Sequence, residues 1–313
     1  NKQKTKKITQ SDKIKIIVPN LKFRMSGVTS TIVRLLPIQG KTQLIFGAGF
    51  NLPDSIPQIS LLIIPFLSRR KPIIWHARRN NEMILGLIYK YAFFCNLVLI
   101  FTSAAQRNHS QLTQFLISKM NHLIATSEKS ASFLKHPSNI IMHGIDTNSF
   151  FPTEDNTKLR EQLNLPNSIL VGCFGRMRPE KGTDLIIDAA IELLNKNYDI
   201  TVVFTGRVTP KFQNFMSIQQ KKIEELNFSK NFLFLGEQSW SDITKTYRAL
   251  DLFVAPARHE GFGLTPLEAM SSGIPVIASE NVGAFNEQII VNKTGLLFEA
   301  GNSIDLTDKL ETL

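Results

Sequence analysis

Short apolar runs of strand length alternate with amphipathic stretches of helical length along the whole chain. Apolar runs bounded by polar and turn residues predict buried strands, and their alternation with helices predicts parallel sheets covered on both faces. In the first half this pattern predicts a helix near Val28–Leu36 and strands at Ile14–Val18, Gln43–Phe46, Ile73–His76, Leu97–Thr102, His122–Thr126 and Ile140–His143.

The pattern is interrupted between Ile145 and Pro166, where a turn-rich segment precedes a charged helical run. We therefore predict two domains, residues 1–148 and 149–313, each a Rossmann-like α/β unit. Ligands of such units bind beyond the carboxyl ends of the strands, which for two facing units is the interdomain cleft. In the second half the predicted strands are Ser168–Phe174, Ile200–Thr205, Phe232–Leu235, Leu252–Ala255, Pro275–Ala278 and Gly295–Phe298, and the predicted helices are Asp184–Asn195, Phe212–Leu226, Ser241–Arg248 and Pro266–Ser271.

One apolar stretch, Met83–Phe101, approaches the length of a membrane span. Lys90 at its middle would be costly in lipid, so we predict an amphipathic helix that leads into a strand. The first residues, Asn1–Lys15, are polar and rich in lysine, which is unlike a signal peptide. The sequence has no initiator Met and stops inside a predicted helix, so we expect it to be part of a longer protein.

Charge is distributed unevenly along the chain. Residues 1–150 hold 20 Lys and Arg against 5 Asp and Glu, whereas residues 151–313 hold 16 against 21, for a net charge of +10. Basic surfaces suit nucleic acid, anionic lipid or phosphorylated substrates, although a generally basic soluble surface explains the excess equally well. Cys95 and Cys173 lie in apolar runs and are expected to be buried free thiols, consistent with a reducing compartment.

The segment Ala255–Met270 offers the richest chemistry. Gly261 and Gly263 permit positive φ and a close approach of ligand to backbone. The loop amides and the N-terminus of the following helix together are predicted to form an anion site. Thr265 is predicted to be the N-cap of that helix, with Glu268 completing a capping box. Glu268 can therefore be either a cap or a ligand-binding carboxylate. Glu260 has no helix to cap and is expected to be free to accept hydrogen bonds from hydroxyls.

Glu260-Gly-Phe-Gly-Leu-Thr-Pro-Leu-Glu268, followed by Ser271-Ser-Gly-Ile-Pro-Val-Ile-Ala-Ser279, resembles the acidic motif of glycosyltransferase family 4. The resemblance implies a GT-B fold, two Rossmann-like domains facing an interdomain cleft, with retaining transfer and the donor on the second domain. It places Glu260 beside the donor sugar and Glu268 at the ribose. It also implies that the loop between them binds donor through Gly261, Phe262, Gly263, Leu264 and Thr265.

A second segment, Gly172–Asp184, follows the first strand of the second half. Arg176 and Lys181 lie five residues apart across a Pro/Gly loop, so both can reach one site and neutralise a departing diphosphate. The alternative is solvated surface charge. Family members have an Arg-x-x-x-x-Lys-Gly segment here that clasps the donor pyrophosphate, which implies donor contacts from Gly175, Arg176 and Lys181. Arg178 is a weaker candidate.

The first half resembles the family more loosely. Gly27 in Arg24–Ser30 matches a loop facing the donor, and a plain turn glycine is the alternative. His76 in Trp75-His-Ala-Arg-Arg79 matches a catalytic histidine near the donor sugar, against a purely structural histidine. Arg78 and Arg79 are candidates to hold an anionic acceptor. His143 replaces the usual Asn of an Asn-Gly-hydrophobic-Asp turn, and Gly283–Ala284 stands where a Gly-Gly pair is common.

No Asp-x-Asp motif or His/Cys cluster occurs in a predicted strand-end loop, so we expect no metal and no cofactor. The sequence as a whole, with its basic first half and the segment Trp75-His-Ala-Arg-Arg79, is most similar to bacterial lipopolysaccharide core mannosyltransferases. This resemblance implies transfer of a hexose from a nucleotide diphosphate sugar, either GDP-mannose or, alternatively, a UDP-sugar. The implied acceptor is an anionic glycolipid or lipopolysaccharide core, reached from the cytoplasm or from the cytosolic membrane face. The competing hypotheses are a GT-B sugar-nucleotide epimerase and a non-catalytic basic binding protein; nucleic acid is not expected because no recognised binding motif is present.

Overall fold

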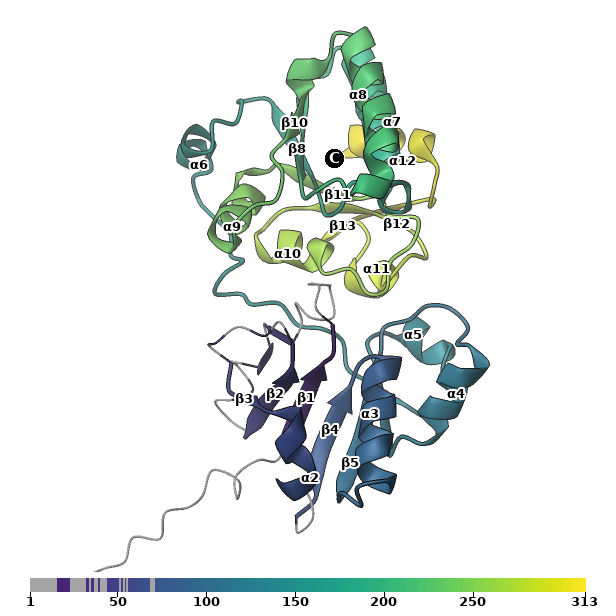
Figure 1. Ribbon diagram of the computed structural model, residues 1–313. Helices are drawn as coiled ribbons and strands as arrows, with labels where there is room; N and C mark the ends of the chain where they lie inside the picture. The colour runs from purple at the N-terminus through teal and green to yellow at the C-terminus, as the bar shows by residue number, and fades with distance from the viewer. Residues whose placement is uncertain are drawn as a thin grey trace, which may run out of the picture. The chain divides into compact units, whose positions relative to one another are not determined.

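The computed structural model describes residues 16–22, 32–33, 35–36, 39, 44–50, 52, 54, 56–67 and 71–313. Contacts divide the chain into two compact units. The first contains residues up to Thr126 and Ser130–Ile141, and the second contains Ser127–Lys129 and Met142–Leu313. Each unit is an α/β layer structure built on a parallel sheet (Figure 1).

The sheet of the first unit has the strand order β3-β2-β1-β4-β5-β6-β7. Its order reverses between β1 and β4, which are paired in parallel, and this reversal is where ligands of such sheets bind. The strands are β1 (Ile16–Asn20), β2 (Ile45–Gly49), β3 (Gln58–Ile59), β4 (Ile73–Ala77), β5 (Leu97–Ser103), β6 (His122–Ala125) and β7 (Asn139–Ile140). The helices whose bounds the structure describes are η2 (Leu61–Ile63), α2 (Ile64–Leu67), α3 (Asn80–Tyr91), α4 (Gln111–Ser118) and α5 (Glu128–Ser132).

The sheet of the second unit has the order β10-β9-β8-β11-β12-β13 and reverses between β8 and β11. The strands are β8 (Ile169–Phe174), β9 (Ile200–Thr205), β10 (Phe232–Phe234), β11 (Leu252–Ala255), β12 (Val276–Ser279) and β13 (Gly295–Phe298). The helices are α6 (Thr157–Gln162), η3 (Pro179–Lys181), α7 (Thr183–Asn195), η4 (Pro210–Phe212), α8 (Gln213–Glu225), η5 (Ser229–Asn231), α9 (Trp240–Ala249), α10 (Thr265–Ser271), α11 (Phe285–Gln288) and α12 (Ser303–Thr312).

Two hydrophobic cores lie on the two faces of the second sheet. Successive strand residues point to opposite faces, so Val254 joins the core under α7, α8 and α12 while its neighbour Phe253 joins the core under α9, α10 and α11. Because both faces are covered, the strands are continuous apolar runs rather than alternating ones. The apolar runs of the second half therefore predicted its strands well, and those at Ile200–Thr205, Leu252–Ala255 and Gly295–Phe298 are confirmed residue for residue.

The first half was predicted less completely. β3 and α4 were missed, and the strand predicted at Ile140–His143 was wrong, because β7 ends at Ile140 and the chain then leaves the sheet. β3 has only two residues, too few to give a periodic signal. The described members of the predicted Val28–Leu36 helix, including Ile32 and Leu36, are helical.

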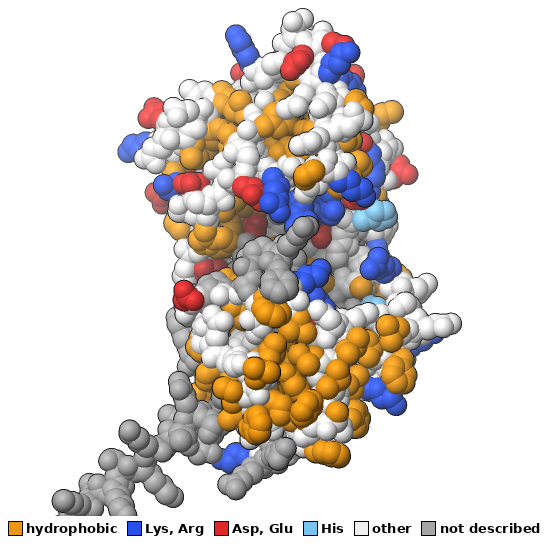
Figure 2. All heavy atoms as spheres, in the orientation of Figure 1, with side chains coloured by type: hydrophobic (Ala, Val, Ile, Leu, Met, Phe, Trp, Pro, Cys, Tyr) orange, Lys and Arg blue, Asp and Glu red, His pale blue; other side chains and the backbone are white. Residues whose placement is uncertain are grey.

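The apolar stretch Met83–Phe101 forms most of α3 and β5, as expected. Among the described residues, no helix is long and apolar enough to cross a membrane. Cys95 and Cys173 are both buried free thiols, also as expected, and burial raises the pKa of Cys173 to about 12. Hydrophobic side chains nevertheless gather on the outer surface of the first unit, over α2, α3 and α4 (Figure 2).

Gly182 connects the loop after β8 to α7 and should be the least replaceable glycine of the second unit. Its φ is +68°, and a Cβ there would lie 1.8 Å from the carbonyl oxygen of Pro256. Gly182→Ala should lower the free energy of unfolding of this unit by about 2 kcal/mol or more, from backbone strain and displacement of the Pro256 loop. Gly144→Ala is the control, because a Cβ at Gly144 would meet nothing within 4 Å. Urea unfolding measures both, and equal stability of the two variants would contradict the close packing.

Candidate donor pocket and the histidine strand

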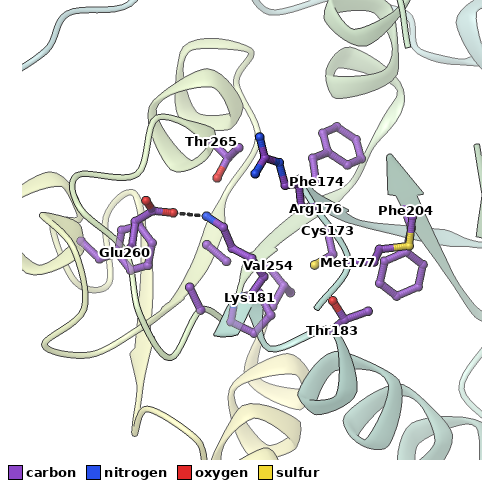
Figure 3. A pocket seen from close by; sticks show the side chains of 15 residues that line it. Cys173, Phe174, Arg176, Met177, Lys181, Thr183, Phe204, Val254, Glu260 and Thr265 are labelled. Carbon is purple, nitrogen blue, oxygen red and sulfur yellow. Dashed lines mark hydrogen bonds and ion pairs between the residues drawn. The ribbon is translucent and has the colours of Figure 1, made fainter. Parts of the chain in front are cut away.

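The loops that follow β8 and β11 enclose one pocket at the point where the sheet order reverses. Gly175, Arg176, Lys181, Glu260 and Thr265 all line it. Figure 3 shows the side chains of the last four. These residues come from segments about 80 positions apart, and the fold brings them together because β8 and β11 are neighbours in the sheet. The pocket therefore contains five of the residues that the sequence assigned to catalysis or donor binding.

At Gly175 the backbone itself lines the pocket, with no side chain covering it. Its φ is +131°, and a Cβ built on it would meet nothing within 4 Å, so its Cα faces free space. Only a few ångströms away, Gly206 packs against the carbonyl of Gly175, where a Cβ would come within 2.0 Å of that oxygen. The end of β8 is thus fixed by Gly206 on the carbonyl side of Gly175 and open on the side where a Cβ of Gly175 would point. The open side suits close approach of a phosphate group.

Lys181 and Glu260 form an ion pair across the pocket, drawn as the dashed line in Figure 3. The second carboxylate oxygen of Glu260 accepts a hydrogen bond from the amide of Gly261 at 3.0 Å. Glu260 therefore has a partner that the sequence did not show, because Lys181, from the other loop, neutralises it. Each carboxylate oxygen keeps further acceptor capacity, so hydrogen bonds from ligand hydroxyls to Glu260 stay a prediction. Arg176 is exposed and makes no ion pair with any other described side chain.

Arg258 joins the two loops and was not singled out from the sequence. Its guanidinium makes two hydrogen bonds to Asp184, at 2.8 and 2.7 Å, and a third to the carbonyl of Pro179 at 2.7 Å. The backbone amides of Arg258 and His259 also donate to the carbonyl of Glu180. The hydrogen bonds to Asp184 raise the pKa of Arg258, so the bidentate pair holds the Lys181 loop against the Glu260 loop at every physiological pH.

Arg178 is not directed at the pocket in the same way. Its side chain lies 3.8 Å from the carboxylate of Glu180, and its amide donates to the hydroxyl of Thr183 at 3.2 Å. Arg178, the weaker candidate for donor binding, therefore lies beside η3 and is not among the residues that line the pocket.

The loop Gly261–Leu264 is fixed by hydrogen bonds from α11. The Gln288 side chain donates to the carbonyl oxygens of Phe262 and Gly263, and the Phe262 ring packs edge-on against His143 at 4.8 Å between centroids. Gly263 has the positive φ that the sequence allowed, +84°, but the reason is packing: a Cβ there would lie 2.3 Å from the Phe285 ring. Leu264 is half-buried and precedes α10.

The capping box predicted for Thr265 and Glu268 was wrong. α10 begins at Thr265, its N-cap is Leu264, and no side chain caps it. Glu268 is instead a buried carboxylate that accepts a hydrogen bond from the hydroxyl of Tyr247 at 2.8 Å. Tyr247 comes from α9, so its contact with Glu268 could not be deduced from the local sequence. A buried carboxylate beside a tyrosine hydroxyl is suited to accept further hydrogen bonds from a polar ligand.

In the first unit, His76 lies on β4 and faces away from the core residue Trp75. Its Nε2 is 2.7 Å from the hydroxyl of Thr102 on β5. Burial, with a smaller contribution from the charge of Arg78, lowers the pKa of His76 to about 3. The imidazole is therefore neutral near pH 7 and can donate or accept a hydrogen bond without carrying charge.

The two arginines after β4 differ in their surroundings. Arg79 donates to the carboxylate of Glu82 at 2.7 Å and to the side-chain oxygen of Asn20 at 2.8 Å, so it ties the end of β1 to α3. Arg78 keeps a buried Nη1 that has no hydrogen-bond partner in the described part of the chain, and burial lowers its pKa to about 10. Of the two acceptor candidates, Arg78 is the one with an unused donor. Gly27 lies outside the described residues.

No group of three or more His, Cys, Asp and Glu residues positioned to hold a metal occurs among the residues that the structure describes. The pocket after β8 and β11 instead combines two cations with one carboxylate. Such a pocket can bind an anion and stabilise negative charge that develops on a leaving group.

Comparison with known proteins identifies the family of the chain. The family model "Glycosyl transferases group 1" matches residues 155–313. The chain is 44% identical over 299 residues to the lipopolysaccharide core biosynthesis mannosyltransferase LpcC of Rhizobium leguminosarum bv. viciae, covering 94% of this chain and 84% of that protein. The chain belongs to the group 1 glycosyltransferases.

Solved structures show the same fold. The Anabaena protein Alr3699/HepE, crystallised in complex with UDP, superposes with a TM-score of 0.82 over 96% of this chain and 89% of that one at 20% identity. The C-terminal domain of the group 1 glycosyltransferase LpcC from Francisella tularensis is 37% identical and covers 54% of this chain and 87% of that domain, with a TM-score of 0.52. The predicted GT-B class, with two Rossmann-like domains, is confirmed.

The low pKa of His76 should make the free energy of unfolding of the protein depend on pH in the acidic range. An unfolded histidine takes up a proton near pH 6.5, whereas folded His76 takes one up only near pH 3, so stability falls as the pH drops below 6.5. Between pH 6.5 and 5.0 this loss is at most about 2 kcal/mol, and His76→Gln should lack it. Urea unfolding of both proteins at pH 7.5 and 5.0 measures the difference. Parallel pH dependence in the two proteins would mean that His76 titrates normally.

Proposed function

We propose that the chain transfers a hexose, mannose, from a nucleotide diphosphate sugar to a lipopolysaccharide core or related glycolipid acceptor, with retention of configuration. The observation that carries the proposal is the meeting of Arg176, Lys181 and Glu260 in one pocket at the reversal point of the donor-side sheet. The R. leguminosarum relative is named a mannosyltransferase of the lipopolysaccharide core, which supports mannose as the sugar. We propose GDP-mannose as the donor. A UDP-sugar is the alternative donor, since the Anabaena protein was crystallised with UDP.

Arg176 and Lys181 are proposed to bind the diphosphate and to stabilise it as it leaves. Two cations at a leaving phosphate supply the electrostatic help that a bound metal supplies in other transferases, so the reaction needs neither metal nor other cofactor. Glu260 is proposed to position the donor sugar and not to attack it. A carboxylate paired with Lys181 is a weaker nucleophile than a free one, which favours front-face departure assisted by the leaving phosphate.

On the acceptor side, we propose that Arg78 binds an anionic group of the acceptor and that neutral His76 hydrogen-bonds near the reacting sugar. The support is the buried, unpartnered Nη1 of Arg78 and the low pKa of His76. Arg79 contributes by holding Asn20 and Glu82 in place. An acceptor of this class is anchored in a bilayer, so the proposed site of action is the cytosolic face of a membrane.

A transfer assay in excess chelator tests the function. With GDP-mannose and a lipopolysaccharide core acceptor, mannose transfer should proceed at the same rate with and without chelator. Lys181→Ala should weaken GDP binding about tenfold or more, because a charge-assisted hydrogen bond contributes roughly 1.5–3 kcal/mol. Lys222→Ala is the matched control, since it also breaks a lysine–carboxylate pair, with Asp188, but on the surface.

Three results would contradict the proposal. A strict requirement for magnesium or manganese would exclude the metal-free mechanism. Turnover of the sugar nucleotide without acceptor would favour an epimerase, and binding without any turnover would favour a non-catalytic protein.

Glu268→Gln separates a ribose-binding role from a structural one. Gln keeps an oxygen that can accept the hydrogen bond of the Tyr247 hydroxyl, so the melting temperature should be nearly unchanged. Loss of the carboxylate should lower the affinity for GDP about tenfold, the typical effect of removing a charged hydrogen-bond partner. Calorimetric titration and thermal unfolding of the Gln and Ala variants measure the two effects. Loss of stability with intact GDP affinity would assign Glu268 to the fold alone.

A further inference from the structure

The first unit carries large apolar side chains on its surface that its own core does not use. We call them the apolar face: the exposed hydrophobic residues of the ranges 62–66, 84–94 and 112–115. Leu62 and Phe94 are each 82% exposed, Phe66 is 75% exposed and Phe115 is 57% exposed. Single exposed apolar residues are ordinary, but a contiguous group of this kind marks an interaction surface.

The elements that carry the apolar face are neighbours. The hydroxyl of Tyr89 on α3 donates to the carbonyl of Leu61 at 3.1 Å, which places η2 and α2 beside α3. On the other side, Asn80 at the start of α3 donates to the hydroxyl of Thr113 on α4 at 2.8 Å. The hydrophobic side chains of α2, α3 and α4 accordingly form one continuous surface (Figure 2).

α3 is apolar on two sides. Met83, Gly86 and Tyr89 are buried against the sheet, whereas Ile84 and Ile88 are exposed one helical turn apart. A surface helix of a soluble protein normally presents polar residues on that outer side. The outer stripe of α3 does not serve the core, because the buried side already packs against Trp75 and the strands.

Phe94, in the turn after α3, is the least expected residue of the face. Its φ is +53°, in the left-handed region where glycine and asparagine are usual and a bulky side chain is unfavourable. It is also almost fully exposed, so neither the turn nor the core benefits from a phenylalanine there. The residue is best explained by something that binds its ring.

The charged residues around the apolar face are almost all basic. Residues 61–119 contain a single acidic residue, Glu82, which is buried and paired with Arg79, against several basic ones. Lys90 lies on α3 itself, and Lys119 follows α4 with its ammonium 5.4 Å from the Phe115 ring. A second copy of the same face would bring like charges together, whereas an anionic lipid surface complements them.

We propose that the apolar face docks the first unit onto an anionic bilayer, with Phe66, Phe94 and Phe115 entering the boundary between headgroups and acyl chains. Aromatic and aliphatic side chains flanked by lysines are the composition of shallow interfacial binding, in which the apolar area and the attraction to anionic lipid add. The lysines would extend their stems along the apolar surface and keep their ammonium groups among the phosphates. The proposal does not depend on which donor or acceptor the enzyme uses.

Phe94→Asn is the sharpest test, because asparagine tolerates the left-handed conformation. The purified full chain should float with phosphatidylglycerol vesicles more than with phosphatidylcholine vesicles, and less at 1 M than at 0.1 M salt. Phe94→Asn should weaken the partition to both lipids about tenfold, the expected effect of withdrawing a buried aromatic ring. Its melting temperature should be unchanged or higher, and its affinity for GDP should be unchanged.

Two further variants complete the experiment. Ile304→Asn removes a side chain of the second unit that is 74% exposed and should leave flotation unaltered. The double variant Lys90→Gln, Lys119→Gln should lose the preference for anionic lipid and keep the weak binding to neutral vesicles. The proposal is overturned if wild type does not float, if Phe94→Asn floats like wild type, or if wild type is a dimer that Phe94→Asn dissociates, because a second copy would then cover the face. GDP affinity, measured on the same samples, reports on the donor site separately.

Discussion

The bidentate pair between Arg258 and Asp184 is the interaction on which the pocket between the β8 and β11 loops depends. Asp184 lies in the first turn of α7, and Arg258 lies in the loop after β11, so the pair joins the two chain segments that flank the reversal of the sheet. Together with the bond from Arg258 to the carbonyl of Pro179, it fixes how far apart those segments can be. Because a bidentate pair restrains orientation as well as distance, Lys181 and Glu260 are held facing each other.

That facing arrangement explains how one pocket can contain both the cations and the carboxylate. Lys181 neutralises Glu260, and the amide of Gly261 donates to the second carboxylate oxygen, so the negative charge of Glu260 is paired. An incoming diphosphate would compete for Lys181 while Arg176 remains exposed beside it. Because Gly175 and Gly206 have no side chains, the end of β8 leaves room for a phosphate to reach the backbone.

The first unit is organised around different constraints. The ion pair of Arg79 with buried Glu82, and its bond to Asn20, tie β1 to α3 and thereby orient the end of β4, where His76 and Arg78 lie. On the outside of the same helix, apolar side chains reach solvent. α3 thus connects a buried polar anchor on one side with an exposed hydrophobic surface on another.

The sequence by itself determined the class of fold, the family and five of the residues that line the pocket. Strands buried on both faces are continuous apolar runs, and the Gly-rich loops with Arg176, Lys181, Glu260 and Glu268 are local patterns, so both can be recognised without contacts. Only the tertiary structure decided which partners these residues have. Lys181 neutralises Glu260, Tyr247 rather than a cap engages Glu268, and Arg258 clamps Asp184, each across a long stretch of chain. It also decided which apolar residues of α2, α3 and α4 face outward, because burial depends on which side of each element meets the sheet.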